Sequence, residues 1–149
     1  METVRLYEMP ACRMVASGYG MFGDGVLERF MAWMETQPRS VFPKDFLGGD
    51  EKGFVWYYLY EEGMSVPEGL NVVDFPGGLY AVACGIDENE VDYVSVMAEL
   101  ERFIEQNPSL EKDPARMELG NVITSPAAQE ALGYCQMDYY KPVRIASKD

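Results

Sequence analysis

The sequence predicts an α+β protein in which a strand, a helix and a strand hairpin occur twice. A pattern of an acidic residue, a large apolar residue, proline and two small residues appears at positions 8–12 and again at positions 74–78. Two amphipathic helices, expected over residues 26–37 and 96–107, each end before a proline. Parallel sheets need a helix after almost every strand, so two helices among about eight strands predict a mostly antiparallel sheet with its helices on one side.

The first copy opens with an apolar run over residues 4–17, which predicts one strand or two strands joined at Pro10. A glycine-rich stretch ends this run and leads to the first helix. Strands over residues 42–47 and 54–60 follow as a hairpin. The helix carries an apolar stripe at three- and four-residue steps, formed by Val26, Leu27, Phe30, Trp33 and Met34.

The second copy follows a short acidic linker and repeats this order, which predicts one domain over residues 1–149 with halves at about 1–65 and 70–145. A strand is expected over residues 72–84, and closing strands over residues 117–122 and 136–143. No element is predicted for residues 121–133. The helix stripe consists of Val96, Met97, Leu100, Phe103 and Ile104.

The charge balance and the absence of histidine restrict the function. The chain has 12 basic and 25 acidic residues, a net charge of −13, and no basic cluster, so direct binding to nucleic acid is not expected and cationic partners are favoured. It has no histidine, which excludes Ser-His-Asp and Cys-His chemistry. Its three cysteines, Cys12, Cys84 and Cys135, lack metal-ligand spacing, so we expect buried thiols and neither a metal nor a cofactor.

The chain shows no membrane signal. No apolar stretch approaches the roughly 20 residues that span a bilayer, and the first residues lack the regions of a signal peptide. We therefore expect a cytoplasmic protein with no membrane partner.

The strand over residues 53–60 is rich in aromatic side chains. Side chains alternate across a strand, so one face carries Phe54, Trp56, Tyr58 and Tyr60. The opposite face carries Val55, Tyr57 and Leu59, and the aliphatic Val55 and Leu59 suit a core covered by a helix. The aromatic face is predicted to be a platform for a flat apolar ligand, with closure of the core or a dimer contact as the alternative.

Glu118 is the second residue with a predicted role. Met117 and Leu119 are expected to point to the core, which directs Glu118 to the other face, the one that the aromatic row occupies by repeat symmetry. A carboxylate beside aromatic rings is costly to desolvate unless a cation compensates it. This arrangement predicts selectivity for lipophilic cations. The alternative is a solvent-exposed strand glutamate.

These motifs, in this order, resemble the GyrI-like family. The family includes stand-alone gyrase-inhibitory-type proteins and effector-binding domains of AraC- and MerR-type multidrug-responsive regulators. The resemblance covers nearly the whole chain. It is carried by the segments at residues 7–11, 53–60, 74–81 and 139–143 together with Glu118.

The resemblance implies two βαββ units about a pseudo-two-fold axis, with an aromatic-lined ligand cleft between them that contains a glutamate. Glu118 matches that glutamate, Trp56 and Tyr58 match the aromatic strand, and Tyr140 matches the closing strand. The family often has a tyrosine two residues after the glutamate, where this chain has Gly120.

The family includes more than one functional class. The resemblance implies a stand-alone protein that binds or senses hydrophobic, cationic aromatic molecules, with any regulation of transcription passing through another protein. One alternative is a hydrolase of strained, cyclopropane-bearing genotoxins, in which Glu118 acts on water and Tyr58 or Tyr140 donates a proton. Another is an inhibitor that binds gyrase or another protein. A homodimer stays open as well.

Overall fold

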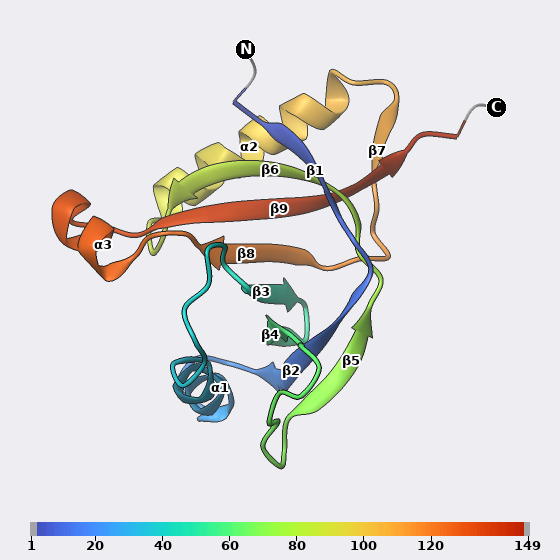
Figure 1. Ribbon diagram of the computed structural model, residues 1–149. Coiled ribbons are helices and arrows are strands. Elements are labelled where there is room, and N and C mark those ends of the chain that lie inside the picture. Colours follow the sequence, from blue (N-terminus) through green and yellow to red (C-terminus); the bar gives the residue numbers. More distant parts are fainter. Residues whose placement is uncertain (1–2, 148–149) are drawn as a thin grey trace. The chain divides into compact units, whose positions relative to one another are not determined.

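The computed structural model describes residues 3–147 and divides the chain into two compact units. The central unit comprises residues 10–77, and the terminal unit comprises the residues up to Met9 and from Gly78 onward. Each unit contains an antiparallel sheet and a main helix, which confirms the predicted α+β class and antiparallel pairing (Figure 1).

The central unit has four strands in the order β3-β4-β2-β5. Helix α1 packs against β2 and β4 (Figure 1). The close approach of this helix depends on Gly20, because a Cβ atom there would lie 2.8 Å from the Cβ of Val26. The elements are β2 (Cys12–Gly20), α1 (Val26–Met34), β3 (Asp45–Asp50), β4 (Gly53–Leu59) and β5 (Asn71–Phe75).

The terminal unit has its strands in the order β1-β6-β9-β8, and β7 also pairs with β9. Helix α2 packs along β6 (Figure 1), where Val96, Leu100 and Ile104 form a core with residues of the sheet. The elements are β1 (Arg5–Met9), β6 (Gly78–Ile86), α2 (Glu90–Glu105), β7 (Leu110–Lys112), β8 (Glu118–Val122), α3 (Pro126–Leu132) and β9 (Gln136–Ile145).

The chain passes between the units at the two copies of the repeated proline motif. β1 ends before Pro10 and pairs with β6, whereas β5 ends before Pro76 and pairs with β2. The first strand of each sequence repeat is thus in a different unit from the helix that follows it. The compact units therefore differ from the predicted halves of about 1–65 and 70–145, because strand pairing over long sequence distances, rather than the repeat, defines them.

Several element boundaries differ from the predictions. The run over residues 72–84 forms two strands, because Pro76 and Gly77 interrupt it. α2 begins earlier than expected, at Glu90, where the Asn89 side chain accepts a hydrogen bond from the backbone N–H of Asp92. β7 and α3 were not predicted, and α3 occupies the stretch with no assigned element. Among the described residues, no helix has the length and apolar character needed to cross a membrane.

Candidate functional site

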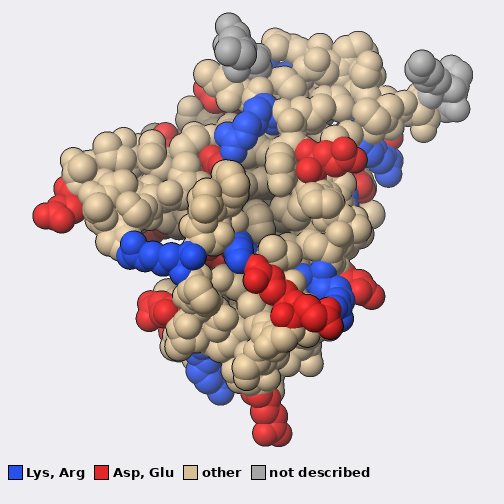
Figure 2. Space-filling view, in the orientation of Figure 1, with Lys and Arg blue, Asp and Glu red and all other residues tan. Residues whose placement is uncertain are grey.

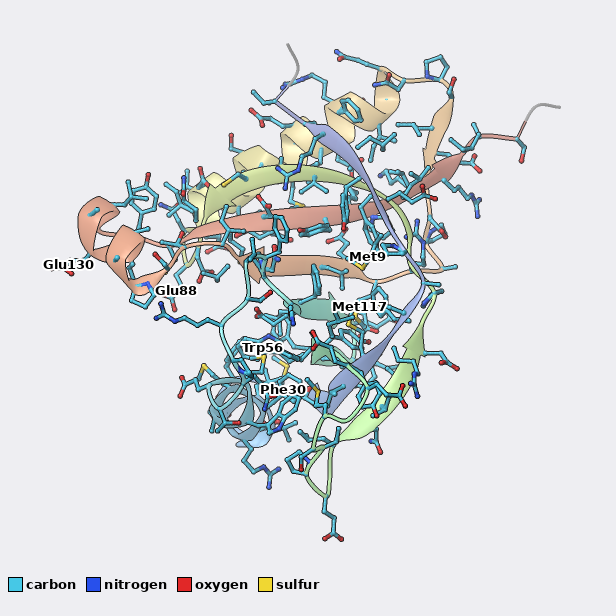
Figure 3. All side chains as sticks on the ribbon, viewed as in Figure 1. Met9, Phe30, Trp56, Glu88, Met117 and Glu130 are labelled. Carbon is cyan, nitrogen blue, oxygen red and sulfur yellow. The ribbon has the colours of Figure 1, made fainter. Side chains whose placement is uncertain are left out.

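Helix α1 covers the aromatic face of β4, which corrects the prediction that Val55 and Leu59 face the helix. The ring of Trp56 stacks on Phe30 of α1 with centroids 6.4 Å apart, and Tyr58 meets Trp33 edge-on at 5.6 Å. Figure 3 shows Phe30 and Trp56 close together. Core closure, the alternative reading, thus holds for Tyr58, which is buried.

A β-bulge in β2 positions Trp56. The register between β2 and β4 shifts after Ala16, and Gly18 adopts a positive φ of 78° that suits glycine. The hydroxyl of the buried Ser17 accepts a hydrogen bond from the backbone N–H of Trp56 at 2.9 Å. This side chain thus replaces the ladder partner that the bulge removes.

Asp45 places a carboxylate beside this aromatic strand. It lies opposite Tyr58 in the β3–β4 ladder and on the same face as Trp56. The Trp56 indole N–H donates to Asp45 Oδ2 at 3.1 Å. Burial raises the pKa of Asp45 above its usual value, and the hydrogen bond from Trp56 opposes that rise. A cation near this carboxylate would favour its charged form.

Part of the aromatic face extends beyond the cover of α1. Phe22, from the loop before α1, is 56% exposed, and its ring lies 5.6 Å from Phe54 and 6.3 Å from Trp56. Phe54 and Trp56 are half-buried. We call Phe22, Phe54, Trp56 and Asp45 the aromatic–Asp45 cluster. It combines accessible ring surface with a carboxylate inside a single unit.

The two other predicted aromatic residues have different surroundings. Tyr60 follows β4 and lies under the guanidinium of Arg13, 4.7 Å from the ring centroid. Burial raises the pKa of Tyr58, so its phenol stays neutral at ordinary pH. Tyr58 is buried, whereas Tyr60 is half-buried with the Arg13 guanidinium over its ring.

Glu118 lies at the start of β8 in the terminal unit and is exposed. Its side chain points to the sheet face that α2 covers, where Lys141 donates to Glu118 Oε1 at 3.0 Å. Within the terminal unit this lysine is the charge partner of Glu118, and the shelter of the glutamate among aromatic rings stays a prediction. Its contact with a ligand stays a prediction.

Tyr140 points to the opposite face of the terminal sheet from Glu118. It pairs with Leu119, the residue after Glu118, and successive side chains alternate between faces. The phenol is buried next to Asp138, and these two effects raise the pKa of Tyr140 to about 12. The structure therefore does not bring Glu118 and Tyr140 together as the base and proton donor that one form of the hydrolase alternative requires.

The face that carries Tyr140 also holds a buried carboxylate that the sequence did not reveal. Asp138 is 5% exposed, and Arg5 donates to its Oδ2 at 2.5 Å. Its neighbour across the strands is Asn121, which is also buried. This ion pair stabilises β1 against β9 within the terminal unit. The only sequence signal for it was the alternation of polar Asp138 with apolar residues.

The described part of the chain offers no metal centre. No group of three or more His, Cys, Asp or Glu side chains among residues 3–147 is arranged to hold an ion. The three cysteines are free thiols, and none of them is fully buried: Cys84 is exposed, and Cys12 and Cys135 are half-buried. The expectation of buried thiols is therefore wrong. Burial raises the pKa of Cys12, which does not favour a reactive thiolate.

The aromatic–Asp45 cluster includes two residues that sequence reasoning did not select. Asp45 lies inside the strand predicted over residues 42–47 and is the first residue of β3, but its position in that strand gave no pattern of its own. Phe22 lies in a glycine-rich loop, where periodicity does not apply. A cross-strand register between β3 and β4 would have placed Asp45 opposite Tyr58, but register is not readable from one strand alone.

No protein-family model and no curated protein sequence matches the chain. Solved structures do. The structure titled SAV2435 bound to tetraphenylphosphonium matches with a TM-score of 0.59 at 13% identity, over 97% of this chain and 94% of that one. A protein described as a hydrolase from Listeria innocua matches with a TM-score of 0.68 at 12% identity, over 96% of this chain and 92% of that one.

The C-terminal domain of EcmrR is similar as well, with a TM-score of 0.61 at 12% identity, over 96% of this chain and 98% of that one. At such identities the likeness is one of fold, and it extends over nearly the full length of both chains. SAV2435 and the EcmrR domain are GyrI-like effector-binding domains. The protein therefore has the fold of the GyrI-like effector-binding domains, the family that its sequence motifs resemble.

Proposed function

We propose that this protein binds lipophilic, cationic small molecules, and that the aromatic–Asp45 cluster supplies part of the binding surface. The observation that carries the proposal is the hydrogen bond from the Trp56 indole to Asp45. It holds a carboxylate at the edge of a ring surface that is partly open to solvent.

The chemistry of the cluster favours cations over neutral or anionic molecules. A cation over the face of a tryptophan or phenylalanine ring gains about 0.5–2 kcal/mol. The Asp45 carboxylate adds a charge attraction that is stronger because the group is partly desolvated. The net charge of −13 raises the local concentration of cations around the protein.

The fold comparison supports the same class of ligand. SAV2435, which has a similar fold, has a solved structure in which it is bound to tetraphenylphosphonium, a lipophilic cation with four aromatic rings. That ligand belongs to SAV2435, and its use as a probe here follows from the proposal.

The proposal is tested by comparing two ions of the same shape and opposite charge. Tetraphenylphosphonium should bind saturably in isothermal titration calorimetry, and tetraphenylborate should bind at least about tenfold more weakly, a difference of about 1.4 kcal/mol. Equal affinity for the two ions would show that only apolar area matters. Absence of binding to tetraphenylphosphonium would count against the proposed function.

Two carboxylate variants then show which acid contributes. Asp45→Asn keeps an oxygen for the Trp56 N–H but removes the charge, and we expect the affinity for tetraphenylphosphonium to fall about tenfold. Glu118→Gln tests the contribution predicted from the sequence. Glu130→Gln is the control, because Glu130 is exposed on α3. Unchanged affinity in Asp45→Asn would remove Asp45 from the proposal.

A further inference from the structure

A hollow of about 280 Å³ lies in the central unit between α1, β2 and the loop that precedes β5. Helix α1 contributes Val26, Arg29 and Trp33, which are three and four residues apart and so share one side of the helix. The loop contributes Glu68 and Leu70. None of these residues belongs to the aromatic–Asp45 cluster.

Two opposite charges line this hollow without being paired. No ion pair within 4 Å joins Arg29 or Glu68 to any residue in the described part of the chain. Arg29 lowers the pKa of Asp24, but both oxygens of that carboxylate already accept hydrogen bonds from backbone N–H groups at 2.9 Å. One cation and one anion therefore remain available at the walls.

The remaining walls are mainly apolar. Val26, Trp33 and Leu70 are half-buried, so each has both packed and accessible surface. Ser17 also lines the hollow, but its hydroxyl already has two hydrogen-bond partners. It accepts a hydrogen bond from the backbone N–H of Trp56 and donates one to the carbonyl of Gly18 at 2.7 Å. The volume of about 280 Å³ is slightly below that of pockets for drug-sized ligands, which run from roughly 300 to 1,000 Å³, so it suits a smaller molecule.

We propose that this hollow is a separate site for a small zwitterion with an apolar side chain, namely a free amino acid of the aromatic or branched aliphatic type. Its carboxylate pairs with Arg29, whose planar guanidinium suits carboxylates. Its ammonium group pairs with Glu68, and its side chain packs against Trp33 and Leu70. Both Arg29 and Glu68 are exposed, so a ligand with only one of the two charges gains only one of the two ion pairs.

The site is tested with L-phenylalanine and two analogues that each lack one charge. Trp56→Phe leaves Trp33 as the one tryptophan of the chain, so its fluorescence reports on the hollow directly. We expect L-phenylalanine to change this fluorescence saturably. 3-Phenylpropanoate, which lacks the ammonium group, and 2-phenylethylamine, which lacks the carboxylate, should each bind about tenfold more weakly.

Variants of the two charged residues should remove these preferences one at a time. In Arg29→Gln, L-phenylalanine should bind no better than 2-phenylethylamine. In Glu68→Gln, it should bind no better than 3-phenylpropanoate. Arg39→Gln, which changes an exposed arginine outside the hollow, should leave all affinities unchanged.

The proposal is overturned if L-phenylalanine gives no saturable change, or if it binds no better than the two analogues in the Trp56→Phe protein without a further substitution. Preferences that survive in Arg29→Gln and Glu68→Gln would also overturn it. Both residues are at the surface of the hollow, so thermal unfolding should confirm that the variants fold. The result is independent of the cation site, because binding of tetraphenylphosphonium is measured separately and is expected to persist in Arg29→Gln.

Discussion

At the scale of single residues, the carboxylates of Glu118 and Asp45 have different kinds of hydrogen-bond partner. Glu118 and Glu101 share the ammonium group of Lys141, at 3.0 and 2.8 Å, and Glu101 also binds Lys112 at 2.7 Å. Asp45 instead has an indole N–H as its hydrogen-bond partner. Among residues 3–147 no lysine or arginine forms an ion pair with Asp45. A cationic ligand would therefore displace no such partner there, which is why we favour this residue over Glu118.

The Glu101 network leads to a prediction about stability. Hydrogen bonds from Lys112 and Lys141 lower the pKa of Glu101 below its usual value of 4.5. The folded state is therefore stabilised while Glu101 is ionised, and this contribution is lost as the pH falls from about 4.5 through the lowered pKa. We expect Glu101→Gln to reduce the free energy of unfolding at pH 7 by about 0.5–1 kcal/mol, since the network is partly exposed.

Urea denaturation at pH 7 and at pH 3 measures this effect. The difference between the wild type and Glu101→Gln should be smaller at pH 3 than at pH 7, because protonation of the Glu101 carboxylate at low pH removes its attraction to the two lysines. Glu105→Gln, an exposed position on the same helix, is the control and should change stability by less than about 0.5 kcal/mol. A difference that is equally large at both pH values would contradict the ionic origin.

At the scale of elements, the bulge in β2 connects the backbone to both candidate sites. Ser17 fills the gap in the β2–β4 ladder and holds the N–H of Trp56, and it also lines the hollow beside α1. A loss of this side chain would thus disturb the strand that carries the aromatic row.

We expect Ser17→Ala to lower the free energy of unfolding by about 1–3 kcal/mol, because the N–H of Trp56 loses its acceptor in a partly buried position. Thermal or urea unfolding measures the loss, and the tryptophan emission should shift as the surroundings of Trp56 change. Ser65→Ala, at an exposed loop position, is the matched control. If both variants were equally stable, the hydroxyl would not be the ladder substitute that we describe.

At the scale of the whole molecule, charge determines which large partners are suitable. The chain has 25 acidic residues against 12 basic residues. On the face drawn in Figure 2, lysine and arginine occur as separated side chains among acidic and uncharged ones. Regulation through a protein partner and a homodimer both stay predictions, as does an inhibitory complex with another protein.

The prediction at this scale is that the 149-residue chain does not bind DNA by itself. Phosphate binding depends on clustered lysine and arginine, and it is strongest at low salt. An electrophoretic mobility-shift assay with random duplex DNA at about 50 mM salt should therefore show no complex at micromolar protein. A salt-sensitive shift would contradict the electrostatic argument.

The sequence by itself determined the elements and the composition of their faces. Alternation in residues 53–60 grouped Phe54, Trp56 and Tyr58 on one face, and the stripe in the first helix identified Phe30 as core, which the structure confirms. The absence of histidine and the excess of acidic residues follow directly from the composition. These properties are local, so they can be read from residues that are close in the chain.

Only the tertiary structure determined which face of a sheet each helix covers and which unit contains the first strand of each repeat. It also determined which carboxylate lies beside the aromatic residues of β4. Alternation shows that two side chains share a face, but it does not show what packs on that face. Asp45 meets Trp56 because β3 and β4 pair in one register, and β5 joins β2 across more than 50 residues of chain. Such pairings depend on the packing energy of the complete unit, which no short segment of sequence contains.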